Sequence, residues 1–371
     1  MHVETTRKLI KRLITHIQAN TTECSDEQMV IASNEFFDEA IHQQEKTQFF
    51  LQTPQVICFA AEVKTSGSFY TTESLGVPLL ITRNEQGELG AFINACAHRG
   101  AKVAQGSGES NRLICQFHGW TYHLDGTLRG RPKQDCFETA GPECNLTRLP
   151  VSDKYGLIVV GLSHQVSQEA VDAHLDSIGG EIDNFSFATM TPLETRRIES
   201  HANWKIIAGL SHESYHFSTL HKDSVAQYLK SNAIYDTFET HSRWAFGLRG
   251  LEQLLDKPES QWPGFLPGAI NHTLFPGTLV ITNPEDAQMI RVEPGKAAGQ
   301  SIIHFSGVCR NADKKDASLE AFDFGFSVFT DEDLPAAEQC QQGFEAGQPT
   351  MIIGKNEPVM AFWHKLWAKL R

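Results

Sequence analysis

The sequence contains no apolar run long enough to cross a membrane, no internal repeat and no low-complexity tract. A spanning helix needs about 20 consecutive apolar residues, so we expect a protein without membrane-spanning segments. Positive charge is also scarce, because the 371 residues carry a net formal charge of −13. This balance argues against nucleic acid or an anionic membrane surface as the main partner.

Paired cysteines at the spacing of a disulfide framework are also lacking. Two of the eight cysteines lie in loops considered below, and the other six are scattered along the chain. Scattered cysteines are typical of reduced thiols in the cytoplasm, where disulfides rarely persist. We therefore expect a cytoplasmic protein whose remaining thiols are free: Cys24, Cys58, Cys136, Cys144, Cys309 and Cys340.

Nucleotide-binding motifs are missing as well. Gly106-Ser107-Gly108 does not stand between a strand and a helix, so it fails the context that a Gly-x-Gly-x-x-Gly fingerprint requires. Neither a P-loop nor a Gly-x-Ser-x-Gly elbow occurs. The sequence thus shows no flavin or nicotinamide site, and any redox chemistry would take its electrons from a separate protein.

Two short loops each supply one cysteine and one histidine. Cys96-Ala97-His98 and Cys115-Gln116-Phe117-His118 are separated by sixteen residues. A single structural zinc usually draws paired cysteines from one hairpin and paired histidines from a helix, and a Cys2His2 zinc knot is the alternative here. One ligand of each type per loop favours a Rieske [2Fe–2S] centre, with both cysteines on one iron and both histidines on the other.

The residues around these ligands point the same way. Cys96-Ala97-His98-Arg99-Gly100 and Cys115-Gln116-Phe117-His118-Gly119-Trp120-Thr121-Tyr122 resemble the cluster loops of Rieske non-haem iron oxygenases. Neither loop contains the additional cysteine with which respiratory Rieske proteins join their loops by a disulfide. The resemblance therefore implies an oxygenase-type cluster.

A second constellation begins at Asn203-Trp204-Lys205 and continues with Glu213, His216 and His221. Two histidines five residues apart lie about 140° apart around a regular helix. A distorted helix or a helix end is needed before both imidazoles can reach one metal. Taken alone, the two histidines would more often be structural or surface residues.

Their surroundings look like the catalytic iron motif of the same oxygenase family. That resemblance implies a 2-His-1-carboxylate site for mononuclear Fe(II), formed by His216, His221 and an aspartate from the C-terminal region. The best match is Asp333 within Phe329-Thr330-Asp331-Glu332-Asp333-Leu334, with Asp331 as the alternative. These acids could otherwise simply favour the positive end of a helix.

The family resemblance also gives Glu213 a role. Related oxygenases place an acid three residues before the first iron histidine, where it connects that histidine to a cluster histidine of the neighbouring subunit. Carried over, Glu213 would connect His216 of one subunit to His118 of the next, within a head-to-tail homotrimer. A glutamate at this place resembles the branch that oxygenates quaternary amines such as carnitine and choline.

Residue patterns and resemblance together predict an α+β protein in three parts. An N-terminal helical segment (1–44) contains an amphipathic helix with Leu9, Ile10 and Leu13 on its apolar face. An all-β Rieske domain (45–165) follows, with strands at Val56–Val63, Ser68–Thr72, Pro78–Arg83, Ala91–Ala95, Leu113–Gln116, Thr121–Leu124, Leu146–Val151 and Leu157–Gly161, and a tight turn at Asp125-Gly126. The catalytic domain (166–371), of the helix-grip (START/Bet v1-like) type, would have strands at Glu194–His201, Thr237–Leu248, Gly277–Thr282, Met289–Pro294 and Ser301–Cys309, and helices near 203–221, 331–346 and 358–371.

These expectations describe the terminal oxygenase (alpha) subunit of a Rieske-type system. It would use O2, and electrons from a separate NAD(P)H-dependent reductase, to hydroxylate or oxidatively demethylate a small organic substrate, for which a quaternary amine is one candidate. One alternative is an aromatic ring-hydroxylating, cis-dihydroxylating dioxygenase. Another is a non-catalytic iron–sulfur electron carrier.

Overall fold

The computed structural model describes residues 3–138 and 141–371, so residues 1–2 and 139–140 of the expected domains lie outside the described residues. The chain divides into two compact units. The larger contains Met1–Gln48, Asp176–Phe185 and Thr191–Arg371, and the smaller contains Phe49–Leu175 and Ser186–Met190. The N-terminal segment and the C-terminal half thus form one unit, although the smaller unit separates them in sequence.

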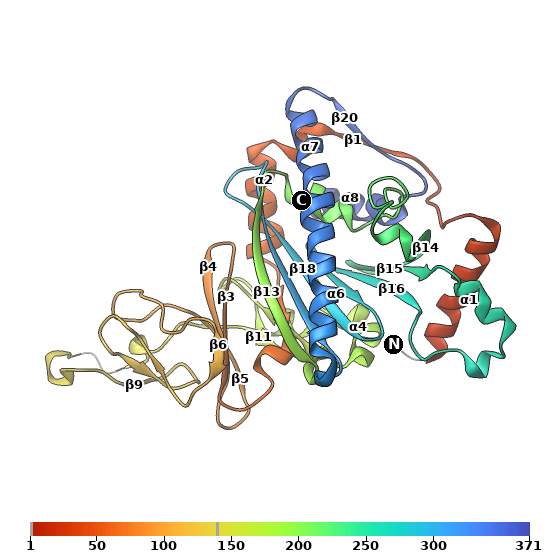
Figure 1. The fold of residues 1–371 in the computed structure, drawn as a ribbon. Helices are drawn as coiled ribbons and strands as arrows, with labels where there is room; N and C mark the ends of the chain where they lie inside the picture. Colours follow the sequence, from red (N-terminus) through yellow and green to blue (C-terminus); the bar gives the residue numbers. More distant parts are fainter. Residues whose placement is uncertain (1–2, 139–140) are drawn as a thin grey trace. The chain divides into compact units, whose positions relative to one another are not determined.

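The smaller unit is built mainly of short antiparallel strands (Figure 1). Its sheets have the orders β10-β5-β4-β3-β6, β11-β12-β2 and β7-β8-β9. The predicted turn at Asp125-Gly126 is confirmed, since Gly126 has φ +87° and the His123 N–H donates to the Thr127 carbonyl at 2.9 Å. The elements are β2 (Gln55–Phe59), β3 (Ser68–Ser74), β4 (Val77–Arg83), β5 (Leu89–Ile93), β6 (Ser107–Glu109), β7 (Leu113–Ile114), β8 (Thr121–Tyr122), β9 (Leu128–Gly130), β10 (Arg148–Leu149), β11 (Val151–Ser152), β12 (Leu157–Val160) and α3 (Gln168–Ala173).

The larger unit is built on a seven-stranded antiparallel sheet with the order β13-β19-β18-β17-β16-β15-β14. Mixed helix and sheet content confirms the α+β prediction. Its elements are α1 (Val3–Ala19), β1 (Met29–Ala32), α2 (Glu39–Glu45), α4 (Asp176–Ile182), β13 (Thr191–Ser200), α5 (Trp204–Leu210), β14 (Leu229–Phe238), β15 (His241–Leu248), β16 (Gly268–Leu274), β17 (Thr278–Thr282), β18 (Asp286–Pro294), β19 (Ser301–Cys309), α6 (Lys315–Val328), α7 (Leu334–Glu345), β20 (Thr350–Ile353) and α8 (Pro358–Leu370).

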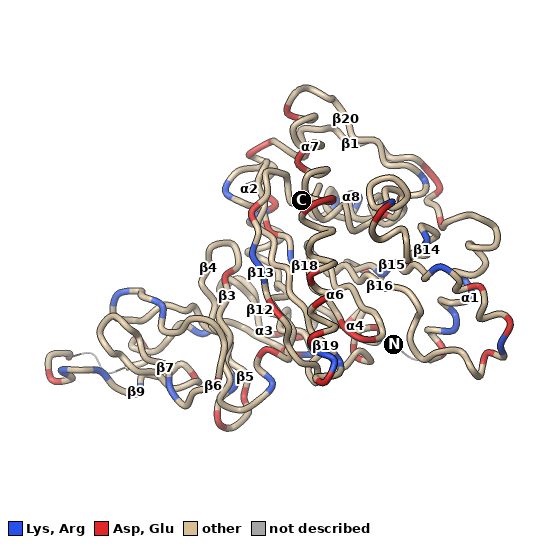
Figure 2. The backbone as a smooth tube through the Cα atoms, in the orientation of Figure 1, with Lys and Arg blue, Asp and Glu red and all other residues tan. Residues whose placement is uncertain are grey.

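Helices α6 and α7 run almost continuously across this sheet (Figure 1), joined by a π-helical turn at Phe329–Asp333. Helix α6 contacts β13 and β19, and α7 contacts α5. The arm formed by α6, the turn and α7 is strongly acidic (Figure 2), with Lys315 as its one basic residue. Its acids are Asp316, Glu320, Asp323, Asp331, Glu332, Asp333, Glu338 and Glu345.

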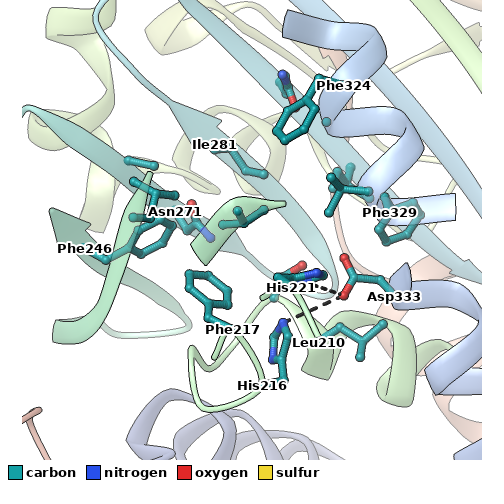
Figure 3. Close-up of a pocket in the computed structure, with 18 of the residues that line it drawn as sticks. Leu210, His216, Phe217, His221, Phe246, Asn271, Ile281, Phe324, Phe329 and Asp333 are labelled. Carbon is teal, nitrogen blue, oxygen red and sulfur yellow. Dashed lines mark ion pairs between the residues drawn. The ribbon is translucent and has the colours of Figure 1, made fainter. Parts of the chain in front are cut away.

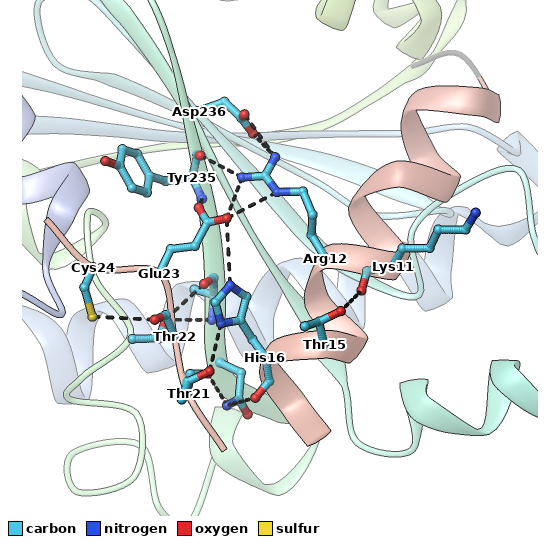
Figure 4. Close-up of polar contacts among 12 residues, drawn as sticks. Lys11, Arg12, Thr15, His16, Thr21, Thr22, Glu23, Cys24, Tyr235 and Asp236 are labelled. Atoms are coloured by element: carbon cyan, nitrogen blue, oxygen red, sulfur yellow. Dashed lines mark hydrogen bonds and ion pairs between the residues drawn. The ribbon is translucent and has the colours of Figure 1, made fainter. Parts of the chain in front are cut away.

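Helix α1 packs against the sheet through the predicted apolar face, whose side chains are buried: Leu9, Ile10, Leu13, Ile14 and Ile17. Its polar side is joined to the edge strand β14 (Figure 4). The Arg12 guanidinium donates to Asp236 at 3.0 Å and to Glu23 at 2.7 Å. Glu23 in turn accepts the Tyr235 backbone N–H at 2.7 Å. The helix therefore protects an edge that would otherwise offer free backbone groups for pairing.

A buried ion pair fixes the start of α5, the helix that leads into the second constellation. Lys205 Nζ lies 2.6 Å from both carboxylate oxygens of Glu45, and both side chains are almost fully buried. Glu45 also accepts the Trp204 indole N–H at 3.0 Å and the Arg371 guanidinium at 3.1 Å. Each charge is therefore paired, as burial requires, and α2, α5 and the C-terminus meet at one carboxylate.

Several predicted element boundaries are wrong. The helix expected over 203–221 ends at Leu210 and gives way to turns, because the two histidines five residues apart cannot share a helical face. The single strand expected at Thr237–Leu248 is a hairpin, β14 and β15, that turns at Glu239 with φ +54°. Helix α6 was not predicted at all, since its apolar residues do not form a clear stripe.

Candidate metal centres

The two Cys/His loops of the smaller unit have nearly the same backbone geometry. The Cys96 carbonyl accepts the Gly100 N–H at 2.8 Å, and the Cys115 carbonyl accepts the Gly119 N–H at 2.9 Å. Both glycines have left-handed φ values, +74° and +71°, which side chains other than glycine rarely adopt. Each loop therefore turns back on itself within four residues of its cysteine.

These turns bring the two histidine rings of the four candidate ligands together. Cys96 and Cys115 are 3% and 2% exposed, whereas His98 and His118 are half-buried. The two imidazole centroids lie 4.6 Å apart, and the His98 ring stacks on Trp120 at 5.2 Å. His98 Nδ1 has no hydrogen-bond partner, so it is available as a ligand atom.

The sulfur side of this group is fixed by Tyr122. Its hydroxyl lies 3.2 Å from Cys96 Sγ and accepts the Ala97 N–H at 3.1 Å. One cysteine and one histidine in each loop fit a two-iron cluster with the cysteines on one iron and the histidines on the other.

The second constellation lies in the larger unit, on irregular backbone after α5. Asn203 caps this helix by accepting the Lys205 N–H at 2.9 Å. Beyond Leu210 the chain forms successive turns, in which the His216 carbonyl accepts the Leu220 N–H at 2.8 Å and the His221 carbonyl accepts the Ser224 N–H at 3.1 Å. The turns rotate the two imidazoles onto one side, with ring centroids 4.8 Å apart.

Asp333 completes this group from the π-helical turn. One ligand atom from each of His216, His221 and Asp333 lies within 4.8 Å of the others. Asp333 Oδ1 lies 3.1 Å from His221 Nε2 and 3.8 Å from His216 Nε2, and it has no hydrogen-bond partner. An orphaned, largely buried carboxylate oxygen facing two imidazoles fits a metal site. The alternative Asp331 is exposed and bonds Thr330 instead.

A π-helical turn is unusual and often marks a functional position. Here it inserts one extra residue per turn between α6 and α7, so that Glu332 and Asp333 both face the histidines. The helix expected at 331–346 is therefore present from Leu334 as α7, while its predicted first residues belong to the π turn.

Both histidines are oriented by an acid at the ring nitrogen away from Asp333. His216 Nδ1 contacts Glu213 Oε1, and His221 Nδ1 lies 2.7 Å from Glu332 Oε2. Ser224 Oγ donates to the same Glu332 oxygen at 2.9 Å. Burial lowers the pKa of His221, but the negative charges of Asp333 and Glu332 and the hydrogen bond to Glu332 outweigh burial and raise that pKa. A carboxylate behind each imidazole fixes its tautomer for metal binding.

The three grouped residues border a cavity of about 170 Å³ (Figure 3). Its wall is mainly apolar and includes six aromatic side chains: Phe217, Trp244, Phe246, Phe305, Phe324 and Phe329. The Trp244 indole N–H donates to the Ser211 carbonyl at 2.7 Å, which fixes this ring against the end of α5. The site thus combines two imidazoles and a carboxylate with a small hydrophobic cavity, and enzyme pockets commonly combine a few polar groups with an apolar wall in this way.

Sequence reasoning did not find every residue of this region. It assigned no role to Glu332 or Ser224, although a glutamate beside the expected aspartate was a usable signal. Asn271 also lines the cavity, from the middle of β16. Nothing in the sequence marked it, because strand β16 itself was not predicted.

Comparison with known proteins supports the division into two domains. Residues 53–149 match the family described as Rieske [2Fe-2S] domain. Residues 187–370 match the family described as ring hydroxylating alpha subunit (catalytic domain). Among the described residues, no helix is long and apolar enough to span a membrane.

Curated relatives are moderately similar. The chain is 29% identical over 210 residues to choline monooxygenase, chloroplastic, of Beta vulgaris, covering 55% of this chain and 46% of that protein. It is 24% identical over 315 residues to the carnitine monooxygenase oxygenase subunit of Acinetobacter baumannii, covering 82% of each. The chain spans about half the length of the choline monooxygenases that it matches.

The fold is shared with a solved structure of a quaternary ammonium Rieske monooxygenase, studied for carnitine oxidation by gut microbiota and inter-subunit electron transfer. The TM-score is 0.77 at 20% sequence identity, covering 92% of this chain and 95% of that one. With both domain families matched in order, the chain belongs to the Rieske non-haem iron oxygenases, as an alpha (oxygenase) subunit with a Rieske [2Fe–2S] domain and a mononuclear-iron catalytic domain.

Proposed function

We propose that this protein is the terminal oxygenase of a Rieske-type system that mono-oxygenates a small quaternary amine. The observation that carries the proposal is the meeting of His216, His221 and Asp333 at the wall of an aromatic-lined cavity. Three protein ligands leave coordination positions free, which catalysis needs and a structural site does not. Aromatic faces attract a cationic ammonium group, and the names of the relatives specify such substrates.

In this proposal Cys96, His98, Cys115 and His118 hold the cluster, and the triad holds the mononuclear iron. When bound, the cluster supplies single electrons and the iron supplies O2 activation. Glu213 and Glu332 hold the imidazoles by their outer nitrogens, so that the inner nitrogens face the metal. The apolar cavity excludes water and holds the substrate close to the triad.

The balanced reaction uses O2, two electrons and two protons per substrate. One oxygen atom enters a C–H bond and the other leaves as water. Hydroxylation at a carbon attached to nitrogen gives an unstable product, which breaks its C–N bond to release an aldehyde and the dealkylated amine. A separate NAD(P)H-dependent reductase would supply the electrons, since the sequence has no nucleotide-binding fingerprint.

The electron path proposed here crosses a subunit boundary. Glu213 already contacts His216 through one carboxylate oxygen, and its side chain is 9% exposed. His118 and Phe117 are accessible at the tip of the cluster loops, Phe117 being 57% exposed. A head-to-tail homotrimer would bring His118 of one subunit to Glu213 of the next. The six cysteines outside the cluster loops form no disulfide with any described residue, which supports a cytoplasmic location.

The experiment is a reaction with 18O2 in the presence of a reductase and a set of quaternary amines, followed by mass spectrometry of all products. We expect an aldehyde, a dealkylated amine and one labelled oxygen atom per turnover. A cis-diol from an aromatic substrate, with both atoms of O2 incorporated, would instead identify a ring-hydroxylating dioxygenase. Consumption of electrons without any oxygenated product would reject both reactions.

A further inference from the structure

The cavity beside the triad is lined by very few charged side chains. Among the described residues that line it there is no lysine, arginine or glutamate, and Asp333 is the one carboxylate. Apart from Asp333 and the two histidines, its polar side chains are the neutral Ser211, Asn271 and Gln288. The wall therefore offers aromatic faces and amides, but no cation.

This composition bears on substrates that carry a carboxylate. Such a group would lose its hydration on entering the cavity without finding a positively charged side chain to replace the water. The one cation within reach would be the metal, whose free positions are needed for O2. A carboxylate is thus disfavoured on the substrate, whereas an ammonium head can rest against the aromatic rings.

Apart from Asp333 of the triad, Asn271 is the described cavity-lining residue that has a buried polar atom without a hydrogen-bond partner. It lies on β16, directly between Trp244 of β15 and Ile281 of β17 in the strand register. Its side chain is 4% exposed, and the amide Oδ1 has no hydrogen-bond partner. Figure 3 shows the amide on the cavity wall beside Phe246, facing the space next to Phe217. A buried amide without partners weakens a fold, so its presence calls for a function.

We propose that Asn271 is a specificity-determining residue that hydrogen-bonds a hydroxyl group of the substrate, and that the substrate is a quaternary ammonium alcohol without a carboxylate. This deepens the proposed function and rests on it. The amide can either accept from or donate to a hydroxyl. The ammonium head occupies the aromatic part of the cavity, which brings an N-alkyl carbon to the triad.

Four probes separate the two requirements. Tetramethylammonium has neither group, choline has the hydroxyl, glycine betaine has the carboxylate, and L-carnitine has both. Their dissociation constants are measured by anaerobic titration calorimetry on the holoenzyme, so that binding is read without turnover. We expect choline to bind about tenfold more tightly than tetramethylammonium, and each carboxylate-bearing probe to bind about tenfold more weakly than its carboxylate-free counterpart.

Two variants test the residue itself. Asn271→Leu keeps the branched shape and the number of side-chain heavy atoms and removes the amide, so the choline advantage disappears while tetramethylammonium binds as before. Thr273→Val is the matched control, because Thr273 lies on the same strand with a buried, unpartnered Oγ1 but does not line the cavity. Each variant removes an unsatisfied polar group, so both raise Tm by a few degrees. Only Asn271→Leu changes binding.

The inference is overturned if L-carnitine or glycine betaine binds as tightly as choline. It is also overturned if Asn271→Leu leaves the choline affinity unchanged, if Thr273→Val weakens it equally, or if no probe binds. The proposed function fails separately: the binding pattern can hold while 18O2 labelling shows no oxygenated product. If the carboxylate-bearing probes bind more tightly than choline and one of them is oxygenated, this inference is rejected and the proposed oxygenase function stands.

Discussion

Glu332 Oε2 lies 2.7 Å from His221 Nδ1, on the side of the imidazole away from Asp333. The adjacent residues Glu332 and Asp333 thus contact the two different nitrogens of the His221 ring. Glu332 and Asp333 both belong to the π-helical turn, and from there both carboxylates reach one histidine.

Replacing Glu332 by glutamine should weaken binding of the mononuclear iron without removing any ligand atom. The neutral amide holds the imidazole less firmly and makes it a poorer donor, which typically lowers metal affinity about tenfold to hundredfold. Iron per chain is measured after dialysis against a graded series of chelator concentrations. Asp331→Asn is the control, since Asp331 is exposed on the same turn. Equal iron retention in both variants would contradict this role.

Glu213→Gln should slow electron delivery to the catalytic iron, and the variant is measured after iron has been added until both metal sites are full, because the substitution also weakens the support of His216. The carboxylate contacts His216 Nδ1, and its charge is lost while its shape is kept. We expect cluster reduction by dithionite to be unchanged, and reoxidation of the cluster on mixing with substrate and O2 to slow at least about tenfold. Stopped-flow absorbance of the cluster measures this step. The control is Asp223→Asn, an exposed acid on the same series of turns. A reoxidation rate equal to that of the parent would remove Glu213 from the path.

Lys205→Met should destabilise the larger unit strongly. Glu45 is fully buried and its two oxygens both face Lys205 Nζ, so the substitution leaves a buried carboxylate short of a partner. Breaking such a pair costs about 3–5 kcal/mol. Lys314→Met is the matched control, because its ion pair with Glu285 at 3.1 Å is exposed and contributes less than about 1 kcal/mol. Chemical unfolding followed by circular dichroism compares the two. A small, equal effect would show that the buried pair does not stabilise the unit.

Stability should fall as the pH drops from about 7 toward 5, in part because several histidines are buried in the neutral form. Burial lowers the pKa of His212, His272 and His364 to about 3, and that of His304 to about 2. The unfolded chain, with histidine pKa values near 6.5, binds protons below that pH that the folded chain does not. Each such histidine therefore costs about 1.4 kcal/mol of stability per pH unit below about 6.5.

The substitution His272→Leu isolates this contribution from that of the carboxylates. Below about pH 6.5 the variant should take up about one proton fewer on unfolding than the parent. This number is obtained from the slope of the free energy of unfolding against pH, measured between pH 7.5 and 5.5. Above pH 7 the same slope is expected for variant and parent, since histidine is neutral in both states there. Parallel lines over the whole range would contradict the neutral burial of His272.

The grouping of His216, His221 and Asp333 was the part of the candidate site that the sequence made most accessible. Spacing alone showed that His216 and His221 could not share a regular helical face, and the structure resolves that problem with turns rather than with a bent helix. The Cys/His loops were equally readable, because each carries its ligands and its glycine within five residues. Sites of this kind can be recognised from the sequence because their residues lie close together along the chain.

The lining of the cavity could not be predicted from the sequence, because it depends on contacts between residues that are far apart along the chain. Asn271 lies at the cavity because β16 pairs with β15 and β17, which places it beside Trp244 and Ile281. These residues are not its neighbours in sequence. The turn at Glu239 uses a positive φ without glycine, so no residue type marked the end of β14. Glu45 and Lys205 meet across 160 positions of sequence. Contacts of this kind depend on the fold as a whole.

The central claim is that one chain holds both a Rieske cluster and a separate iron at His216, His221 and Asp333. Anaerobic purification followed by iron and acid-labile sulfide assays, with EPR of the dithionite-reduced protein, tests it most directly. We predict about three irons and two sulfides per chain, and a Rieske-type signal. Asp333→Ala should retain that signal and the sulfide while losing about one iron. Zinc without sulfide, or an Asp333→Ala variant with unchanged iron content, would contradict the account.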